Sequence, residues 1–178
     1  MSLHPPSKPA ESRTPNRSLV RGVLQGLGFA AASYGAAALG ALTMRGKGRP
    51  DGAWYRSLNK PVFQPPSAAV GPVWSVLYGT IAYSGWRVWR APESPERTRA
   101  LALWATQLAL NAAWTPLFFG ARKPAAALVD MVALDVAAGA YAAAAAKVDR
   151  QAAAVFAPYL AWIAFATALN GAIVVKNR

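Results

Sequence analysis

The 178-residue sequence contains no cysteine and a single histidine, His4. The lack of cysteine excludes disulfides, thiolate metal sites and cysteine nucleophiles, and one histidine cannot build a zinc site or a histidine-based catalytic triad. Acidic residues are also scarce, since 7 Asp and Glu stand against 19 Lys and Arg, giving a formal net charge of +12. Such an excess is typical of proteins that bind nucleic acids or membranes. We expect no metal site and no required cofactor.

Charge is nearly absent from five long windows of the sequence. Asp130 and Asp135 are the only charged residues inside them. A soluble helical bundle needs a charged stripe on every outer helix, and these windows have none. Each is long enough to cross a hydrocarbon core of about 30 Å. The pattern predicts an all-α fold, an integral membrane bundle of five transmembrane helices, from the windows 22–44, 61–86, 100–121, 124–146 and 151–175.

The chain divides into three parts. Residues 1–18 are basic and rich in proline, which predicts a disordered tail. The transmembrane domain is expected over 19–175, with a short C-terminal tail over 176–178. Its helices are predicted over 19–44, 71–90, 96–119, 124–147 and from about 151 to 175, with a kink at Pro158. The longest connection, 45–70, has the length of a lid or binding loop.

The basic residues lie in the connections between helices. With five spans, one face of the bundle receives ten Lys and Arg and the other receives nine. This even division argues against a nucleic-acid-binding stripe, and it gives no orientation in the membrane. Trp86, Arg87, Trp89 and Arg90 form a predicted belt at the membrane–water interface.

Several polar and aromatic residues share helix faces. Their spacing of three or four residues predicts that Trp74 lies beside Tyr78, and Asn111 beside Trp114. Trp162, Ala166 and Leu169 follow one another along the last helix. An apolar pocket with a few polar groups suits a flat, hydrophobic ligand. The alternative is that these rings fill the bundle core.

Two further patterns admit structural explanations. Asp130 and Asp135 are five residues apart and point to different faces, so we expect each to meet a partner within the protein or to lie toward the membrane interface, rather than to form a catalytic pair. Small residues repeat at a spacing of four in Gly22/Gly26 and Ala36/Gly40. Such pairs allow close helix approach in lipid, either within the chain or at a dimer face.

A series of motifs resembles the signature of the TspO/MBR family. The resemblance runs in order over about residues 54–171 with the family's spacing. The motifs are Trp54-Tyr55, Leu58-Asn59-Lys60-Pro61, Pro65-Pro66, Gly71-Pro72-Val73-Trp74, Leu77-Tyr78, Gln107-Leu108-Ala109-Leu110-Asn111, Trp114, Phe118-Phe119-Gly120-Ala121-Arg122, Ala127-Leu128-Val129-Asp130, Pro158-Tyr159-Leu160-Ala161-Trp162 and Ala168-Leu169-Asn170.

The resemblance implies a five-helix transmembrane bundle, often a homodimer, that binds porphyrins, haem and other tetrapyrroles. Some members also bind cholesterol. It implies a pocket beneath the first loop, with Trp54 and Tyr55 as its lid. The lining carried over from the motifs comprises Trp74, Tyr78, Asn111, Trp114, Trp162, Ala166 and Leu169. The partners expected are thus a tetrapyrrole such as protoporphyrin IX, the lipid membrane and a second copy of the chain, and no nucleic acid.

Three activities agree with this resemblance. The first is a membrane receptor or sensor for tetrapyrroles. The second is light-dependent porphyrin degradation through the tryptophans Trp74 and Trp162, which would make the protein an enzyme. The third is transport of tetrapyrroles across the membrane, although the sequence has no internal repeat of the kind many transporters show.

The sequence departs from the family's pattern in two places. The sterol-recognition stretch of animal members falls at 169–176 and lacks tyrosine here, which argues against sterol-like lipids as ligands. Ala126 stands where animal members have a pocket tryptophan. The composition, rich in alanine and arginine, suggests a bacterial cell membrane as the location.

Overall fold

The computed structural model describes residues 17–43 and 52–178, and every regular element in these ranges is helical. The predicted tail over 1–18 lies outside the described residues except for its last two. The helices are α1 (Arg17–Thr43), α2 (Ala53–Ser57), α3 (Ser67–Arg90), α4 (Pro95–Thr115), α5 (Pro124–Val148) and α6 (Arg150–Lys176), with a π-helical turn η2 (Pro116–Gly120) directly after α4.

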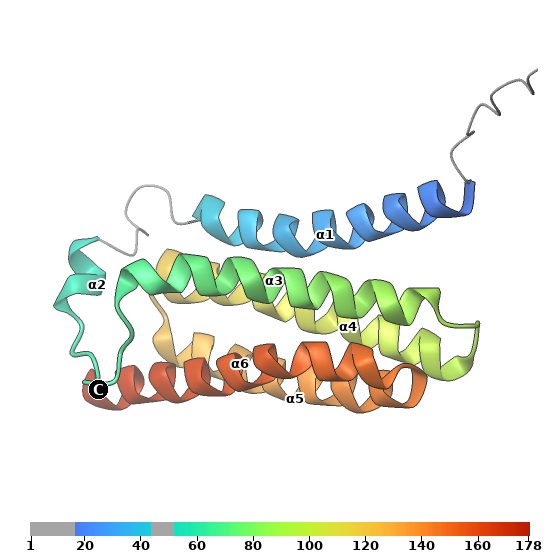
Figure 1. The fold of residues 1–178 in the computed structure, drawn as a ribbon. Coiled ribbons are helices and arrows are strands. Elements are labelled where there is room, and N and C mark those ends of the chain that lie inside the picture. Colours follow the sequence, from blue (N-terminus) through green and yellow to red (C-terminus); the bar gives the residue numbers. More distant parts are fainter. Residues whose placement is uncertain (1–16, 44–51) are drawn as a thin grey trace, which may run out of the picture.

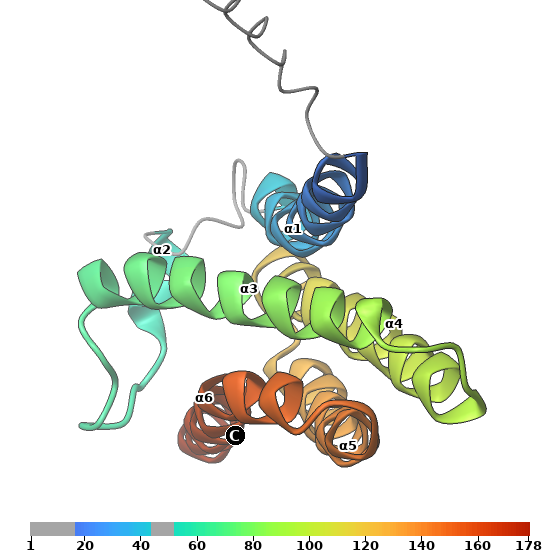
Figure 2. The same ribbon diagram turned by 45° about the vertical axis from the view of Figure 1, so that its right-hand side comes forward.

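The five long helices form a closed ring in which α1 packs on α3, α3 on α6, α6 on α5, α5 on α4, and α4 on α1. Figures 1 and 2 show α1 on one side of α3 and α4, with α5 and α6 on the opposite side. Short connections join the antiparallel neighbours α3 and α4, α4 and α5, and α5 and α6. The prediction of an all-helical bundle is confirmed.

Within the described ranges, three helices are long and apolar enough to cross a membrane: Ser18–Leu42, Pro124–Val148 and Arg150–Lys176. The helices α3 and α4 are 24 and 21 residues long but less apolar. In α4, charged Glu96, Arg97 and Arg99 fall in the first turns. Membrane crossing by all five long helices therefore stays a prediction.

The helix boundaries differ from the predicted ones in three places. The helix α3 begins at Ser67, one turn before Gly71, and includes Pro72 in its second turn. The predicted third helix changes to π-helical geometry from Pro116, whose nitrogen has no hydrogen to donate. The short helix α2 inside the first loop was not predicted at all.

Side-chain caps stabilise the N-terminal ends of α4 and α6. Ser94 caps α4 by accepting a hydrogen bond from the Arg97 N–H at 3.1 Å, and Pro95 occupies the favoured first position. Asp149 caps α6 by accepting bonds from the N–H groups of Gln151 and Ala152. These caps fix the residues at which α4 and α6 begin.

Gly26 and Gly40 of α1 pack against other helices of the chain, whereas a Cβ at Gly22 would meet nothing within 4 Å. A Cβ at Gly26 would lie 3.6 Å from Trp86, and one at Gly40 would lie 3.1 Å from Thr115. Trp86 donates a hydrogen bond from its indole nitrogen to the Gly22 carbonyl at 3.1 Å. Of the two explanations for the four-residue spacing, packing within the chain is therefore the one that these contacts support.

Candidate functional site

Trp74 and Tyr78 lie one turn apart on α3, as their spacing predicted, with ring centroids 5.4 Å apart. The phenol of Tyr78 is buried and donates a hydrogen bond to Asn111 Oδ1 on α4 at 2.6 Å. Asn111 Nδ2 in turn donates to the Tyr159 hydroxyl on α6 at 3.0 Å. This chain of hydrogen bonds joins three helices and fixes the orientation of the Asn111 amide.

Trp162 on α6 faces Trp74 across the bundle. Their ring centroids lie 6.3 Å apart at an interplanar angle of 86°, an edge-to-face contact. Trp74 also meets Tyr159 edge to face at 6.4 Å. Ala166, one turn beyond Trp162, packs against the same buried cluster. Four predicted site residues on α3 and α6 thus come together, and Tyr78 ties them to Asn111.

A second aromatic cluster lies at the η2 end of α4. Trp114 stacks on Phe118 with centroids 5.1 Å apart and an interplanar angle of 24°. Phe118 and Phe119 form the buried centre of this cluster, and Leu169 of α6 packs against them. Trp114 also packs against the larger cluster that holds Trp74 and Trp162. It is therefore the residue that joins the two groups.

The predicted lid residues belong to the second cluster. On α2, the Trp54 ring lies 5.8 Å from Phe118, and the Tyr55 ring lies 5.4 Å from Phe119. Lys60 Nζ lies 4.6 Å from the centre of the Tyr55 ring, and burial raises the pKa of Tyr55 above its ordinary value of 10.0. The phenol of Tyr55 thus stays neutral. The ring contacts show that α2 covers Phe118 and Phe119 rather than Trp74.

Another part of the first loop reaches the tryptophan pair. Phe63 meets Phe165 of α6 at a centroid distance of 6.1 Å, and Phe165 meets Trp162 at 5.7 Å. The loop is also fastened to the chain's C-terminal end, where Asn59 and Asn177 exchange hydrogen bonds. In Figure 1, α2 and the loop after it lie at the same end of the bundle as the C-terminus.

Sequence reasoning did not select four residues that build this site: Phe63, Phe118, Phe119 and Tyr159. Three of them stood inside the quoted motifs, as Phe118-Phe119 and Pro158-Tyr159. Tyr159 lies one helical turn before Trp162, so the spacing already placed its ring beside the predicted pocket. Phe63 carried no signal, because its partner is about a hundred residues away in the sequence.

Two buried donors in these clusters have no hydrogen-bond partner among the described residues. They are the indole nitrogens Nε1 of Trp114 and Trp162. Buried polar groups in proteins are nearly always paired, so unpaired ones need an explanation. A bound group with acceptor oxygens would satisfy them. In the described ranges, no three Asp, Glu, His or Cys side chains gather as a metal site would require.

The two acidic residues of α5 lie outside both clusters. Asp135 accepts a hydrogen bond from the Thr167 hydroxyl of α6 at 2.8 Å. Asp130 Oδ2 is buried and has no partner within the part of the chain that is described. The expected protein partner is therefore found for Asp135 and not for Asp130 Oδ2. Ala126 is half-buried in the first turn of α5.

A sequence model of the TspO/MBR family matches residues 29–175. The chain belongs to this family. A translocator protein from Sus scrofa is 43% identical over 127 residues, covering 70% of this chain and 75% of its own length. A tryptophan-rich protein TspO from Archaeoglobus fulgidus is 40% identical over 129 residues, with 70% and 80% covered. A tryptophan-rich sensory protein from Cereibacter sphaeroides is 38% identical over 144 residues, with 81% and 85% covered.

Membership of the TspO/MBR family agrees with the apolar helices and the membrane setting predicted from the sequence. The family match begins in α1 and includes every aromatic residue of the two clusters. Its relatives come from mammals, an archaeon and a bacterium. The suggested bacterial source is therefore not established by these relatives.

Proposed function

We propose that this TspO/MBR protein is a membrane receptor or sensor that binds a tetrapyrrole, such as haem or protoporphyrin IX, between α3, α4 and α6. The observation that carries the proposal is the pair of unpaired indole N–H groups of Trp114 and Trp162 beside aromatic rings, one stacked on Trp114 and one edge to face with Trp162. A porphyrin offers a flat apolar face for the rings and carboxylate oxygens for the donors. The resemblance assigns both residues to the same pocket.

Physical estimates support such binding without a metal–histidine bond. Removing about 400 Å² of apolar ligand surface from solvent contributes roughly 10 kcal/mol before costs. Association and side-chain ordering offset much of that gain, which leaves room for micromolar affinity. Arg56 and Lys60 on the first loop add positive charge near the propionates of a porphyrin.

Binding would require the aromatic rings to move. Trp74 contacts both Tyr78 and Trp162, so a flat ligand enters only when at least one of these contacts opens. Each aromatic pair contributes about 0.5–1.5 kcal/mol beyond its buried area. The ligand's own stacking replaces this loss, and we expect the tryptophan spectrum to change on binding.

The test is a titration with protoporphyrin IX that follows quenching of tryptophan fluorescence. Trp114→Phe/Trp162→Phe keeps aromatic rings but removes both donors, and we expect the Kd to rise at least tenfold, because each lost bond to a charged oxygen costs about 1.5–3 kcal/mol. Trp89→Phe, at the far end of α3, is the matched control. An unchanged Kd in the double variant would contradict the proposed site.

Two other activities stay predictions and use the same preparation. Illuminating the bound complex and following the porphyrin absorption band tests light-dependent degradation, with Trp74→Phe and Trp162→Phe as the informative variants. Flux of protoporphyrin IX into proteoliposomes tests transport. The homodimer also stays a prediction, for which cross-linking in the membrane is the direct measurement.

A further inference from the structure

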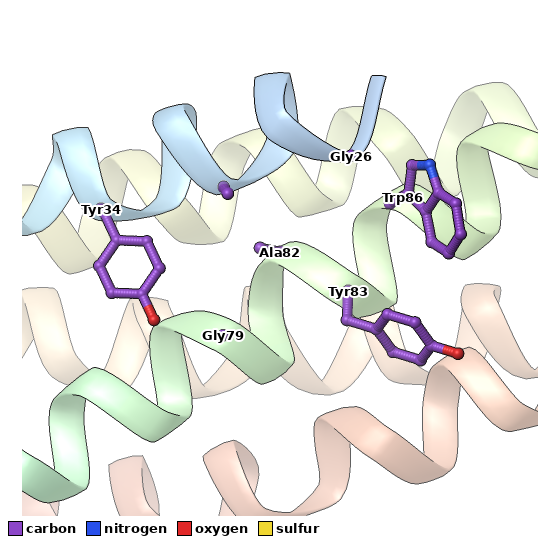
Figure 3. Close-up of a pocket in the computed structure, with 7 residues that line it drawn as sticks. Gly26, Tyr34, Gly79, Ala82, Tyr83 and Trp86 are labelled. Atoms are coloured by element: carbon purple, nitrogen blue, oxygen red, sulfur yellow. The ribbon is translucent and has the colours of Figure 1, made fainter. Parts of the chain in front are cut away.

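A cavity of about 220 Å³ lies between α1 and α3, away from the two aromatic clusters. Tyr34, Tyr83 and Trp86 line it together with small residues, among them Gly26 on α1 and Gly79 on α3. Figure 3 shows Tyr34 reaching from α1 toward α3, and Trp86 rising from α3 beside Gly26. The small residues allow α1 and α3 to pack closely, and the aromatic rings border the space that remains between the two helices, here called the α1–α3 seam.

The lining of this cavity is apolar in effect, because its polar atoms are already used. The Tyr34 hydroxyl donates to the Ser75 carbonyl at 2.7 Å, and Trp86 Nε1 donates to the Gly22 carbonyl. The Tyr83 hydroxyl accepts from Arg87 at 3.3 Å. Each of these three polar atoms already makes one hydrogen bond, so little polar capacity is left in this lining to recognise a polar ligand. The volume is also below the range of about 300–1,000 Å³ for drug-sized ligands, so it suits a hydrocarbon chain rather than a ring system.

A second cavity of about 350 Å³ lies between α1 and α3 at the Arg21 end of α1 and has the opposite character. Arg21 and Gln25 of α1 and Arg90 of α3 line it. The Arg90 guanidinium lies 4.9 Å from the centre of the Trp86 ring, so a residue of the second cavity contacts one that lines the first. Neither Arg21 nor Arg90 forms an ion pair with any residue that the structure describes. Two cations from different helices thus share this space, and no carboxylate of a described residue lines it.

The arginines and the apolar cavity follow one another along α1 and α3 in the same order as the headgroup and acyl chain of a lipid. From Arg21 to Tyr34, α1 rises about 20 Å, against about 15 Å for half of a hydrocarbon core. The arginines lie at the helix ends, where Trp86, Trp89 and Arg90 were predicted to meet the membrane surface. The apolar cavity lies toward the middle of the bundle, and the neighbouring surface of α1 is apolar, with Val23 and Leu27 exposed.

We infer that the α1–α3 seam is a binding site for one anionic phospholipid, whose phosphate lies between Arg21 and Arg90 and whose acyl chain enters the cavity beside Trp86. Basic pockets between transmembrane helices are known to hold anionic headgroups. The site is separate from the proposed tetrapyrrole pocket, so either can fail without the other.

The whole protein is reconstituted in phosphatidylcholine vesicles that contain a minor fraction of phosphatidylglycerol. Two preparations are compared: one in which only the phosphatidylglycerol carries brominated acyl chains, and one in which only the phosphatidylcholine does. Bromine quenches tryptophan only at contact, so excess quenching by brominated phosphatidylglycerol reports the lipid beside Trp86. We expect this excess in the unchanged protein and its loss in Trp86→Phe. Equal quenching by both lipids, as when a second copy of the chain covers the seam, overturns the inference.

Charge variants separate this site from general attraction to a basic surface. Arg21→Gln and Arg90→Gln are each expected to lower the preference for phosphatidylglycerol about fivefold. Arg99→Gln removes the same charge at the same end of the bundle from a residue that lines neither cavity, and we expect the preference to persist. If Arg99→Gln lowers it as much as Arg90→Gln, the inference is wrong.

A further pair of variants tests the acyl-chain half of the site. Ala30 lines the apolar cavity, and Ala30→Phe fills it while both arginines remain. Exposed Ala31 is its neighbour, so Ala31→Phe is the matched control. We expect the excess quenching to disappear in the first variant and persist in the second, with unchanged melting temperatures showing that α1 stays docked. Wild-type quenching in Ala30→Phe would overturn the assignment of the chain to this cavity.

Discussion

Asn59 in the first loop and Asn177 after α6 hold each other by two hydrogen bonds across 118 residues of sequence. The Asn59 N–H donates to Asn177 Oδ1 at 2.9 Å, and Asn177 Nδ2 donates to the Asn59 carbonyl at 3.0 Å. A third bond runs from Asn59 Nδ2 to the Lys176 carbonyl at 3.4 Å. The loop that bears the predicted lid is therefore fastened by the chain's last residues.

Asn177→Ala is expected to loosen this loop. Losing two exposed hydrogen bonds costs about 1–2 kcal/mol of loop stability, which corresponds to a five- to thirty-fold rise in the open population. Trypsin cleavage after Arg56 on α2 measures that population. Lys176→Ala removes a neighbouring side chain but keeps the backbone acceptor, so its cleavage after Arg56 should stay at the wild-type rate. Equal rates in all three proteins would show that the two asparagines do not restrain the loop.

Asn111→Ala is expected to destabilise the bundle by about 1–2 kcal/mol. The change leaves the hydroxyls of Tyr78 and Tyr159 without their partner in an apolar interior, where such bonds are worth about 0.6 kcal/mol on average and up to about 1.7. Thermal or denaturant unfolding in detergent measures the loss. A double-mutant cycle with Tyr159→Phe should show non-additive energies, and strict additivity would mean that the two side chains are not coupled.

Gly85→Ala tests the tightest side-chain packing against a glycine in the described part of the chain. A Cβ there would lie 2.5 Å from Trp104 Nε1 and 2.9 Å from Phe29 Cδ1, so the indole must move from its hydrogen bond to the Ile81 carbonyl. We expect a loss of about 1–3 kcal/mol in the free energy of unfolding. Gly139→Ala is the control, because no atom lies within 4 Å of its new Cβ and alanine favours helix by up to about 1 kcal/mol. Equal effects would contradict the packing at Gly85.

Asp149 should make stability depend on acid pH. Partial burial alone would raise its pKa, but hydrogen bonds from Arg87 and from the N–H groups of Ala152 and Gln151 lower it below the ordinary value of 3.8. The folded chain therefore binds fewer protons than the unfolded one in this range. The contribution is complete above a pH of about 5 and disappears as the pH falls through the folded pKa.

Two substitutions at Asp149 separate its two roles. Asp149→Asn keeps a side chain that caps α6 but removes the charge, and it should cost at most about 1 kcal/mol at neutral pH, since the ion pair is partly exposed. Asp149→Ala also removes the cap and should cost about 1 kcal/mol more. Melting temperatures across acid pH measure both. The wild type and Asp149→Asn should converge at low pH, and a constant gap would refute the linkage.

The main helices could be predicted because their signal is local. Charge-free windows of about 20 residues and the prolines between them locate five long helices to within a turn or so. The start of α3 was placed too late, at Gly71, because proline is favoured in the first turn of a helix, whereas Pro72 lies in the second turn of α3. The five-residue α2 was missed because it is too short to show any periodicity.

The candidate site could be predicted only within each helix. The spacing of Trp74 and Tyr78 places both on one face, but nothing local says that Trp162 meets Trp74 or that Asn111 bridges two tyrosines. The position of Trp54 and Tyr55 over Phe118 and Phe119 depends on the π-helical turn η2, which proline and glycine permit but do not require. Contacts between helices arise from tertiary packing. The spacing of residues in a single sequence does not show which residues of two helices meet.

The sparse burial of α1 has a consequence for how the protein is assembled. Few residues of α1 are buried, among them Ser33 and Ala36, and both Tyr34 and Gly22 form hydrogen bonds with α3, to Ser75 and Trp86. The ribosome synthesises α1 before α3. The whole surface of α1 must therefore be compatible with lipid until α3 packs against it.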